Sequence, residues 1–400
     1  MAKTKIAIID HLNAAGGLIR FSNSLAFNIA ALNKNIKIDY YINYHSLNDN
    51  ADLFRNPPGN LTIKVLDATR AQSRFGRYGK SILEKTFRIK KHNPLIDELT
   101  KKINGYQAIY FSAPHMSQWV PVEGNKFGTF HDFNWKYLFG TPIFSKSTVE
   151  FYESELSKWF ADTKPVVSTN FIESELKKFY PEATYVPRVI YLPSLGRSVV
   201  QNSESSLKIL KKHELNYPYI LYPAHFYAHK NHLNLIVAFS KLKETKDFKH
   251  HKLVFTGTGT DHFKKGKATK YGLEKNESDY DVIGLGYISN NEIDAIISGA
   301  KLVISTSLYE AGSGPALDAW SNRTPFIMSD IPAHKDQLDF FNIDCLLFDP
   351  FDTNDIADKM AFSLKNIDIS KNYSEKADLA LQKYTWTQAG QQYLQMFLNN

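Results

Sequence analysis

The sequence of 400 residues contains a single cysteine, Cys345, and no long uninterrupted hydrophobic run. One cysteine excludes an intramolecular disulfide, so a reducing, cytoplasmic setting is the simplest expectation. A membrane-spanning helix needs about 20 consecutive apolar residues, and no run approaches that length. The N-terminus leads into a strand-like run at residues 6–10 with no long apolar core of the signal-peptide type. We therefore expect any membrane contact to be peripheral.

The chain also lacks helix-turn-helix, zinc-finger and RNP-like patterns. Its net charge is +7 and its pI is about 9.0, which favours anionic partners. This total does not choose among nucleic acid, phospholipid headgroups and nucleotide diphosphates. Without an accompanying motif, nucleic acid ranks last, and we expect none to bind.

Hydrophobic residues make up 43% of the chain and aromatic residues 14%, which is enough to bury sizeable cores. At this length two domains are expected, with three as the alternative. Short apolar strands alternate with helices, a pattern typical of α/β domains with mostly parallel sheets. The predicted strands lie at 6–10, 38–42, 61–66, 108–111, 126–130, 166–170, 185–189, 219–223, 252–256, 281–286, 302–305 and 324–329.

The pattern of strands and helices stops after residue 190 and restarts near residue 219. We predict a first domain at 1–190, a polar linker at 191–210 and a second domain at 211–383, because the region between contains Pro, Gly and a polar run. Residues 384–400 are predicted to form a terminal segment whose amphipathic helix begins near Ala389, with Thr387 as its cap. The chain thus contains two successive α/β halves.

Two carboxylates stand out in the stretch from 302 to 330. An apolar strand is followed by a turn and a helix, with Glu310 just beyond the strand and Asp318 one or two turns into the helix. Open α/β sheets bind ligands at the carboxyl ends of their strands, which is where both acids fall. The alternative, that they are solvated loop and helix-cap residues, stays open.

Between these acids, Gly312, Ser313 and Gly314 precede the helix. Small residues leave backbone N–H groups uncovered at a helix N-terminus, an arrangement that suits a phosphate. Because a carboxylate would repel a phosphate, we expect the acids to hold hydroxyl groups of a sugar or ribose.

Three further residue groups follow predicted strands. Gly16 and Gly17 can bring backbone amides close to a ligand, although a plain tight turn is an equal alternative. His131 follows the strand at 126–130, where a binding role and a structural role are both open. Lys230 stands at the start of a helix after the strand at 219–223, where it can neutralise a diphosphate; an ordinary surface lysine is the alternative.

The segments 221–232 and 307–315, LYPAHFYAHKNH and SLYEAGSGP, together with Asp318, resemble glycosyltransferase family 4. The closest likeness is to a bacterial polysaccharide subgroup with HKNH and EAGS-type motifs. The resemblance is strong over 219–340 and weaker at the glycine pair, at His131 and at the Trp386 segment. Three positions differ from the usual pattern: His225 replaces a common arginine, Asp318 a glutamate, and Ser313 a glycine.

The resemblance implies a GT-B architecture, in which two Rossmann-like domains face across a cleft. The N-terminal domain would bind the acceptor, the C-terminal domain would bind the nucleotide-sugar, and the terminal helix would cross back to the N-terminal domain. Lys230, Glu310 and His131 would be the catalytic residues. The donor would contact the following residues: Gly16, Gly17, His225, Lys230, Asn231, Glu310, Gly312, Ser313, Gly314, Pro315 and Asp318.

The implied function is a retaining hexosyltransferase without a bound metal or cofactor, acting in cell-surface polysaccharide synthesis such as that of lipopolysaccharide. Its donor would be a GDP-, UDP- or dTDP-sugar, and its acceptor a glycan or a lipid-linked molecule. Two alternatives keep the fold: a binding module without transfer activity, and a nucleotide-sugar epimerase.

Basic residues are concentrated between 70 and 102, with aromatic and aliphatic residues interleaved. Such an amphipathic basic helix can lie on an anionic membrane surface, here the inner face of the plasma membrane. A solvated basic face over an ordinary core is at least as good an explanation, and both stay open.

Overall fold

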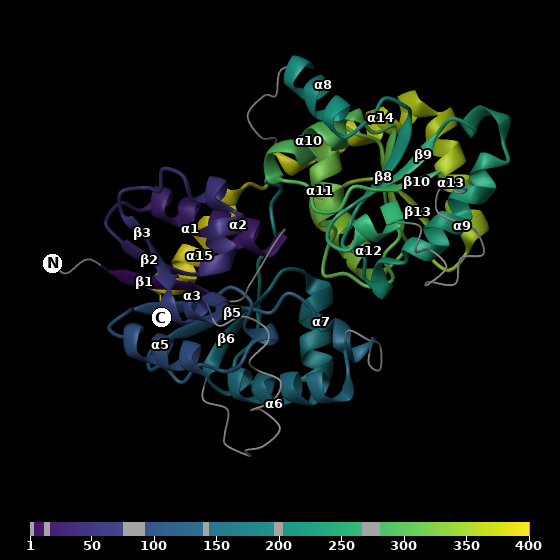
Figure 1. Ribbon diagram of the computed structural model, residues 1–400. Coiled ribbons are helices and arrows are strands. Elements are labelled where there is room, and N and C mark those ends of the chain that lie inside the picture. The colour runs from purple at the N-terminus through teal and green to yellow at the C-terminus, as the bar shows by residue number, and fades with distance from the viewer. Residues whose placement is uncertain are drawn as a thin grey trace. The chain divides into compact units, whose positions relative to one another are not determined.

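The computed structural model describes residues 4–11, 17–74, 93–138, 144–195, 203–265 and 281–399. The chain divides into two compact units, one made of Met1–Leu192 with Trp386–Asn400 and the other of Pro193–Thr385 (Figure 1). Each unit is built on a sheet whose strands all pair in parallel. The prediction of an α/β protein with mostly parallel sheets is confirmed.

The first unit alternates strands and helices and closes with the last helix of the chain. Its elements are β1 (Lys5–Asp10), α1 (Gly17–Leu32), β2 (Lys37–Asn43), α2 (Tyr44–Asp49), β3 (Leu61–Leu66), α3 (Asp67–Arg74), α5 (Pro94–Lys102), β4 (Ala108–Phe111), β5 (Lys126–Thr129), α6 (Lys146–Asp162), β6 (Thr163–Val167), α7 (Asn170–Phe179), β7 (Arg188–Val189) and α15 (Trp386–Leu398).

The sheet of this unit has the strand order β3-β2-β1-β4-β5-β6-β7. β1 lies between β2 and β4, and Ile6 is in register with Ile38 on one side and Ala108 on the other. Residues Ile6 to Ile9 are fully buried, as expected for a parallel strand that is covered on both faces. The chain therefore changes direction in the sheet beside β1, and such a switch point leaves a crevice at the carboxyl ends of the strands.

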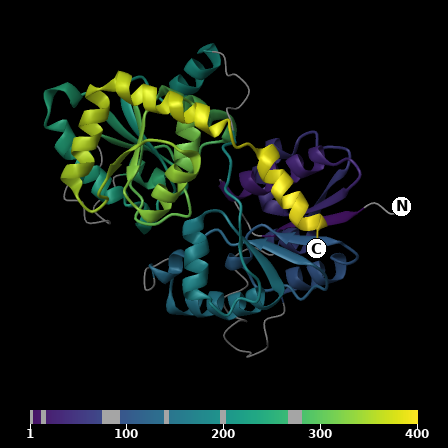
Figure 2. The same cartoon turned by 180° about the vertical axis from the view of Figure 1, so that it is seen from behind.

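The last helix, α15, packs against α1 within the first unit (Figure 2). Gly390 permits a close approach, because a Cβ atom there would lie 3.1 Å from Leu32 Cδ1. Tyr393 and Phe397 are fully buried and contact the ring of Tyr110 in β4. The helix already begins at Trp386, so the prediction of Thr387 as its cap is wrong: this residue lies inside the first turn.

The second unit repeats the same alternation. Its elements are α8 (Ser203–Lys212), β8 (Tyr219–Pro223), α9 (His232–Lys243), β9 (Lys252–Thr256), β10 (Val282–Gly284), α10 (Asn290–Gly299), β11 (Leu302–Ser305), α11 (Gly314–Ser321), β12 (Phe326–Ser329), α12 (Pro332–Phe341), β13 (Leu346–Phe348), α13 (Thr353–Lys365) and α14 (Ile367–Leu381).

The strand order of the second sheet is β10-β9-β8-β11-β12-β13, so β8 and β11 are neighbours at its switch point. Alternate side chains enter two separate cores on the two faces of the sheet. Ile220 belongs to the core that includes α9 and α13, whereas Leu221 belongs to the core that includes α10, α11 and α14. This layering leaves the carboxyl ends of β8 and β11 side by side, and it is from these ends that the two most prominent sequence motifs depart.

Some elements were not predicted from the sequence. These are mainly helices α6 and α12 to α14, together with the short strand β13. β10 has three residues instead of the six predicted, and it lies between two residues with left-handed conformations, Asp281 with φ of 56° and Gly286 with φ of 72°. The strands that position the candidate site were all predicted to within a few residues.

Candidate functional site

Lys230 and Glu310 meet at the switch point of the second sheet. Lys230 ends a short 3₁₀ turn, Ala228–Lys230, that follows β8, and Glu310 lies in the loop after β11. The ammonium group of Lys230 donates a hydrogen bond to the Glu310 carboxylate, and the two form an ion pair. The side chains are only 17% and 14% exposed, so the pair is mostly shielded from water. The adjacency of the two strands brings these residues together.

Hydroxyl groups from the same strands hold the pair in place. Ser307 Oγ donates to Glu310 Oε1 at 2.6 Å. Tyr222 OH lies 2.9 Å from Ser307 Oγ and donates to the backbone carbonyl of Lys230 at 3.0 Å. Thr306 Oγ1 donates to the same carbonyl at 3.0 Å. Sequence reasoning missed these three residues, although all of them lie at or just beyond the carboxyl ends of strands.

The charge state of Glu310 follows from its surroundings. Burial acts to raise the pKa of this carboxyl, but the positive charge of Lys230 and the hydrogen bonds from Lys230 and Ser307 outweigh it, so the net pKa lies below its ordinary value. Glu310 is therefore ionised at neutral pH. An ionised carboxylate accepts hydrogen bonds and cannot donate them, as a group that holds sugar hydroxyls requires.

Three histidines surround Lys230 without adding positive charge at neutral pH. Burial, helped by the charge of Lys230, lowers the pKa of His229 to about 4 and that of His232 to about 3. Burial also lowers the pKa of His225, whose Nδ1 accepts a hydrogen bond from the backbone N–H of Thr258 at 2.9 Å. Lys230 is consequently the cation of this group of residues.

The small-residue loop leads into α11, with Ser313 as its N-cap. Ser313 Oγ accepts the N–H of Ala316 at 3.2 Å, and Pro315 occupies the first turn, where a missing N–H is harmless. The backbone N–H of Ser313 donates a hydrogen bond to Oε1 of Gln337 at 2.5 Å. Gly312 and Gly314 stay partly or fully accessible, and Asp318 is half-buried on α11.

Asn231 has a conformational role beside Lys230. Its φ of 59° is left-handed, and it stands at the junction between the 3₁₀ turn and α9. Its side-chain Nδ2 donates to the backbone carbonyl of Pro350 at 2.7 Å. The residue thereby turns the chain sharply after Lys230 and ties the start of α9 to the loop before α13.

Of the remaining predicted residues, the first unit holds His131 just beyond the carboxyl end of β5 and Gly17 at the start of α1. His131 follows β5, and its Nε2 lies 2.9 Å from the carbonyl oxygen of Ser112 after β4. Burial lowers its pKa to about 4, so the ring is neutral and Nε2 carries the proton that the carbonyl accepts. Phe21 packs edge-on against this ring at 5.0 Å. Gly17 is exposed at the first position of α1, and Gly16 lies outside the described residues.

A buried carboxyl group near the same sheet edge was not predicted as a site residue. Asp10, the last residue of β1, accepts hydrogen bonds from Ser22 Oγ at 2.6 Å and Tyr40 OH at 3.2 Å. Burial raises its pKa to about 6 against the opposing effect of these hydrogen bonds. Its polar character at a strand end was the available signal.

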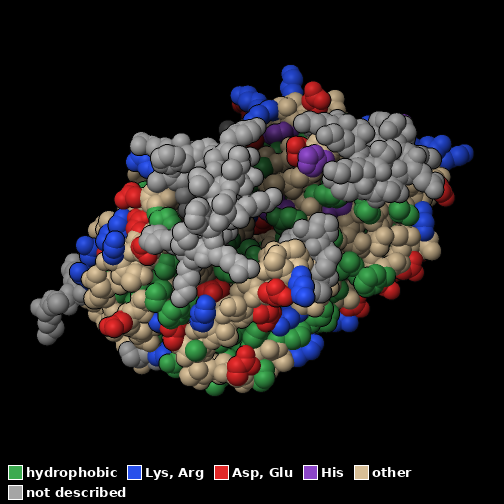
Figure 3. Space-filling model, turned by 60° about the horizontal axis from the view of Figure 1, so that its bottom comes forward, with side chains coloured by type: hydrophobic (Ala, Val, Ile, Leu, Met, Phe, Trp, Pro, Cys, Tyr) green, Lys and Arg blue, Asp and Glu red, His purple; other side chains and the backbone are tan. Residues whose placement is uncertain are grey.

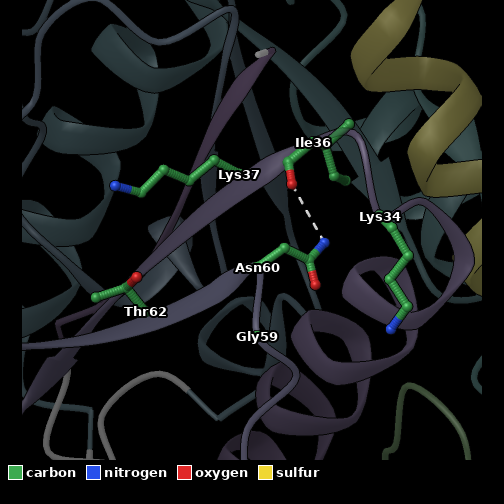
Figure 4. A pocket seen from close by; sticks show the side chains of 6 residues that line it. All are labelled: Lys34, Ile36, Lys37, Gly59, Asn60 and Thr62. Carbon is green, nitrogen blue, oxygen red and sulfur yellow. Dashed lines mark hydrogen bonds between the residues drawn. The ribbon is translucent and has the colours of Figure 1, made fainter.

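A cavity of about 320 Å³ lies elsewhere, at the amino ends of β2 and β3 (Figure 4). Its lining includes Lys34, Lys37 and Asn60. Asn60 Nδ2 donates to three backbone carbonyls at the end of α1 and the following turn, which is a structural task. The cavity contains none of the predicted site residues.

The described residues contain neither a candidate metal-binding cluster nor a candidate membrane-spanning helix. No three His, Cys, Asp or Glu side chains in that part of the chain are grouped so that they could hold a metal ion. No helix in it is long and apolar enough to cross a membrane. Most of the basic segment at 70–102, residues 75–92, lies outside the described ranges.

Solved structures with the same fold define the class of architecture. Sucrose-phosphate synthase from Thermosynechococcus elongatus is similar with a TM-score of 0.70 and 18% identity, covering 99% of this chain and 98% of that one. HepE from Anabaena, in complex with UDP and glucose, has a TM-score of 0.67 and 13% identity over 99% and 100%. WaaG, a glycosyltransferase involved in lipopolysaccharide biosynthesis, is similar with a TM-score of 0.68 and 13% identity, covering 99% of this chain and 100% of that one. The fold is GT-B, with two Rossmann-like domains, as predicted.

A family model matches within this architecture. Residues 206–379 match glycosyl transferases group 1, a span that begins in α8, ends in α14 and includes Lys230 and Glu310. No curated protein sequence matches the chain. The matched region is thus the second unit, which carries the paired charges and the small-residue loop.

Proposed function

We propose that the protein is a retaining glycosyltransferase, which moves a hexose-type sugar from a nucleotide diphosphate sugar to a glycan or lipid-linked acceptor. The observation that carries this proposal is the shielded Lys230–Glu310 pair at the switch point of the sheet in the unit that matches glycosyl transferases group 1. Similar folds solved with UDP and glucose, or described in lipopolysaccharide biosynthesis, support a nucleotide-sugar donor and a role in cell-surface polysaccharide synthesis.

The pair has a direct use in sugar transfer. A diphosphate entering the site would compete with Glu310 for Lys230, and the released carboxylate would accept hydrogen bonds from sugar hydroxyls. During transfer, the bond between the anomeric carbon and the phosphate oxygen breaks and its electron pair stays on that oxygen. The acceptor hydroxyl oxygen bonds to the same carbon, and its proton passes to the departing phosphate oxygen or to water. Lys230 would stabilise the negative charge that develops on the phosphate.

The other predicted residues take supporting roles in this proposal. Gly312, Gly314 and Pro315 would shape the diphosphate site, and Asp318 would hold the ribose. His225 and Asn231 would position the loop that bears Lys230. In the first unit, His131 would act near the transferred sugar, and the Gly16 and Gly17 turn would approach the phosphates.

A donor panel tests the proposal. Purified protein should release nucleoside diphosphate from one member of a set of UDP-, GDP- and dTDP-sugars when a lipid-linked or glycan acceptor is present. We expect Lys230→Ala to lower kcat by about 100-fold or more, since loss of one preorganised charge-stabilising group typically costs this much. Lys376→Ala, which removes an exposed lysine of α14, is the matched control and should keep wild-type activity.

The panel also separates the alternatives. Donor binding without turnover in the presence of many acceptors would favour a non-catalytic binding module. Conversion of the donor without any acceptor would favour an epimerase. If no nucleotide sugar binds, the proposed function is wrong.

Stereochemistry and metal dependence need separate measurements. We propose retention of the anomeric configuration, which NMR of the freshly formed product would test; an inverted product would contradict it. We also propose that no bound metal or other cofactor is needed. Activity should then persist after dialysis against a chelator, whereas loss of activity that Mg²⁺ or Mn²⁺ restores would refute this part.

We further propose a cytoplasmic location with peripheral contact at the inner face of the plasma membrane through residues 70–102. Among the described members of this segment, Lys102 is paired with Glu98 and Asp67, which reduces its free charge. Lysine, arginine and acidic side chains are interspersed on the face seen in Figure 3. Sedimentation with anionic vesicles should weaken at high salt and on neutralisation of Arg74, Arg77 and Lys80. Binding that is absent or insensitive to salt would count against the proposal.

A further inference from the structure

Gln337 makes a two-point contact with the small-residue loop before α11. It lies in α12 and is 4% exposed. Its Oε1 accepts the N–H of Ser313 at 2.5 Å, and its Nε2 donates to the carbonyl oxygen of Ser313 at 3.2 Å. A primary amide can serve as donor and acceptor at once, so this one side chain satisfies both backbone groups of Ser313.

This contact determines which amides of the loop remain available. The N–H of Ser313 points into the protein, and Ala316 N–H is already capped by Ser313 Oγ. In the described part of the chain, the N–H groups of Gly312 and Gly314 have no hydrogen-bond partner, and Gly314 is exposed. The sequence predicts Gly312, Ser313 and Gly314 together as amide donors to a ligand, whereas in the structure the N–H of Ser313 is already bonded to Gln337 and those of the two glycines are left for that task.

α12 also holds the other end of the same loop. His334, one turn before Gln337, has its Nδ1 2.8 Å from the carbonyl oxygen of Ser329. Ser329 Oγ donates to the carbonyl oxygen of Ser307 at 2.6 Å, and Ser307 Oγ donates to Glu310. The loop from Ser307 to Ser313 is therefore bonded directly to α12 at its Ser313 end and indirectly, through Ser329, at its Ser307 end, with Glu310 and Gly312 in between.

We propose that Gln337 is a positioning residue for donor binding. By fixing the orientation of the Ser313 backbone, it turns the Gly312 and Gly314 N–H groups toward the diphosphate of a nucleotide sugar. This inference rests on the proposed function, because it needs a diphosphate at this loop. Gln337 touches no ligand itself and acts only through the backbone it holds.

Binding of a nucleoside diphosphate and of the corresponding nucleoside can be compared in the same variant. The comparison separates an effect on the diphosphate site from a general loss of stability, which would weaken binding of both ligands. We expect Gln337→Met to weaken binding of the cognate nucleoside diphosphate by about 10- to 100-fold, as for the loss of one or two charge-assisted hydrogen bonds. Binding of the corresponding nucleoside, which lacks phosphate, should change less than about twofold. Gln382→Met, at an exposed position after α14, is the control and should bind both ligands as wild type does.

A measurement on the unaltered protein keeps the proposal testable if Gln337→Met does not fold. With selectively labelled serine and glycine, NMR hydrogen exchange should find the Ser313 amide protected in the free protein. The Gly312 and Gly314 amides should exchange quickly and gain protection when nucleoside diphosphate is added. Fast exchange at Ser313 in the free protein, or a new ligand-induced protection there alone, would overturn the inference.

The outcomes distinguish this inference from the proposed function. If the wild-type protein binds no nucleoside diphosphate, the proposed function fails. If the wild type binds a nucleoside diphosphate, two results would refute only the role of Gln337. In the first, Gln337→Met weakens binding of the diphosphate and of the nucleoside equally; in the second, it weakens binding of neither.

Discussion

Glu310 owes its ionised state to a partner that is 80 residues away in the sequence. Burial alone would favour the neutral acid, and the positive charge of the nearby Lys230, helped by hydrogen bonds from Lys230 and Ser307, reverses that preference. The pair thus keeps a carboxylate charged in a mostly shielded place, and under the proposed function a diphosphate would compete with it for the lysine. The three hydroxyls around it reduce the freedom of both side chains, so that the proposed donor binding would require little reorganisation.

The carboxyl group of Asp10 should make stability fall as pH rises. Its pKa in the folded protein is about 6, above the ordinary 3.8, so the folded state binds the proton more tightly than the unfolded state. The contribution of the protonated carboxyl to the free energy of unfolding is fully present below pH 3.8. It is lost as the pH rises through about 6, and the total loss is up to about 3 kcal/mol. We therefore expect the stability of Asp10→Asn relative to wild type, measured as unfolding free energy in urea, to be higher at pH 7 than at pH 4.

The pH dependence of this difference is the quantity that tests the assignment. An offset that is the same at every pH would reflect packing of the new amide and not titration.

The junction between the Lys230 turn and α9 depends on the conformation of Asn231. At φ of 59° a residue with a Cβ atom is strained, and alanine lacks the local compensation that asparagine has. Both Asn231→Ala and Asn231→Gly lose the hydrogen bond to Pro350, but alanine should cost about 1 kcal/mol more in unfolding free energy than glycine. Chemical denaturation of the two variants measures this difference.

Asn234 provides a matched control for this backbone effect. Its side chain donates to the same Pro350 carbonyl at 3.3 Å, but it lies within the regular part of α9. There alanine should be at least as well tolerated as glycine, since alanine has the higher helix propensity. The same order of stability at both positions would contradict the proposed strain at Asn231.

The contact between α15 and α1 has little space at Gly390. An added Cβ would lie 3.1 Å from Leu32 Cδ1 and 3.6 Å from Asn28 Cβ, a tight fit that the end of the leucine side chain can relieve. Gly390→Ala should be close to neutral, because helix propensity offsets the crowding. Gly390→Leu should destabilise by about 1–3 kcal/mol through overpacking, measured by thermal or chemical unfolding. Equal stability of both variants would mean that the two helices are not packed as described.

The whole molecule contains several buried histidines that are neutral at pH 7. Burial lowers the pKa of His11, His131 and His229 to about 4, and that of His232 to about 3. The unfolded chain binds protons near pH 6.5, so the folded state loses stability as pH falls from 6.5 toward 4. We expect a marked acid-induced drop in unfolding free energy over this interval.

A single replacement checks the origin of this drop. Among the described residues, neither ring nitrogen of His11 has a hydrogen-bond partner, so His11→Leu removes a titrating group without breaking a side-chain hydrogen bond within that part of the chain. The variant should lose less stability than wild type between pH 6.5 and pH 4. An unchanged slope would mean that His11 is not buried in the neutral form.

Local patterns were sufficient for the strands and for the overall class of fold. Continuous apolar runs such as 6–9 and 302–304 have to be buried on both faces, and their alternation with helices permits few arrangements other than parallel sheets. The sequence likewise indicates where the strands end, which is why it predicts Lys230 and Glu310 as candidate ligand contacts. Their placement depends only on short-range order along the chain.

Pairing between distant residues required the tertiary structure. That Lys230 and Glu310 form an ion pair depends on β8 and β11 being neighbours, and strand order is set by long-range packing. The same holds for Gln337, whose amide reaches the Ser313 backbone only because α12 packs beside the loop. Hydrogen bonds of this kind leave no periodic trace in a sequence, since any polar residue on a solvent-facing helix could look the same. The sequence by itself thus determined the strands, the turns and the chemical groups at their ends. The tertiary structure determined which of these groups meet and which backbone N–H groups remain free, because both depend on packing between distant segments.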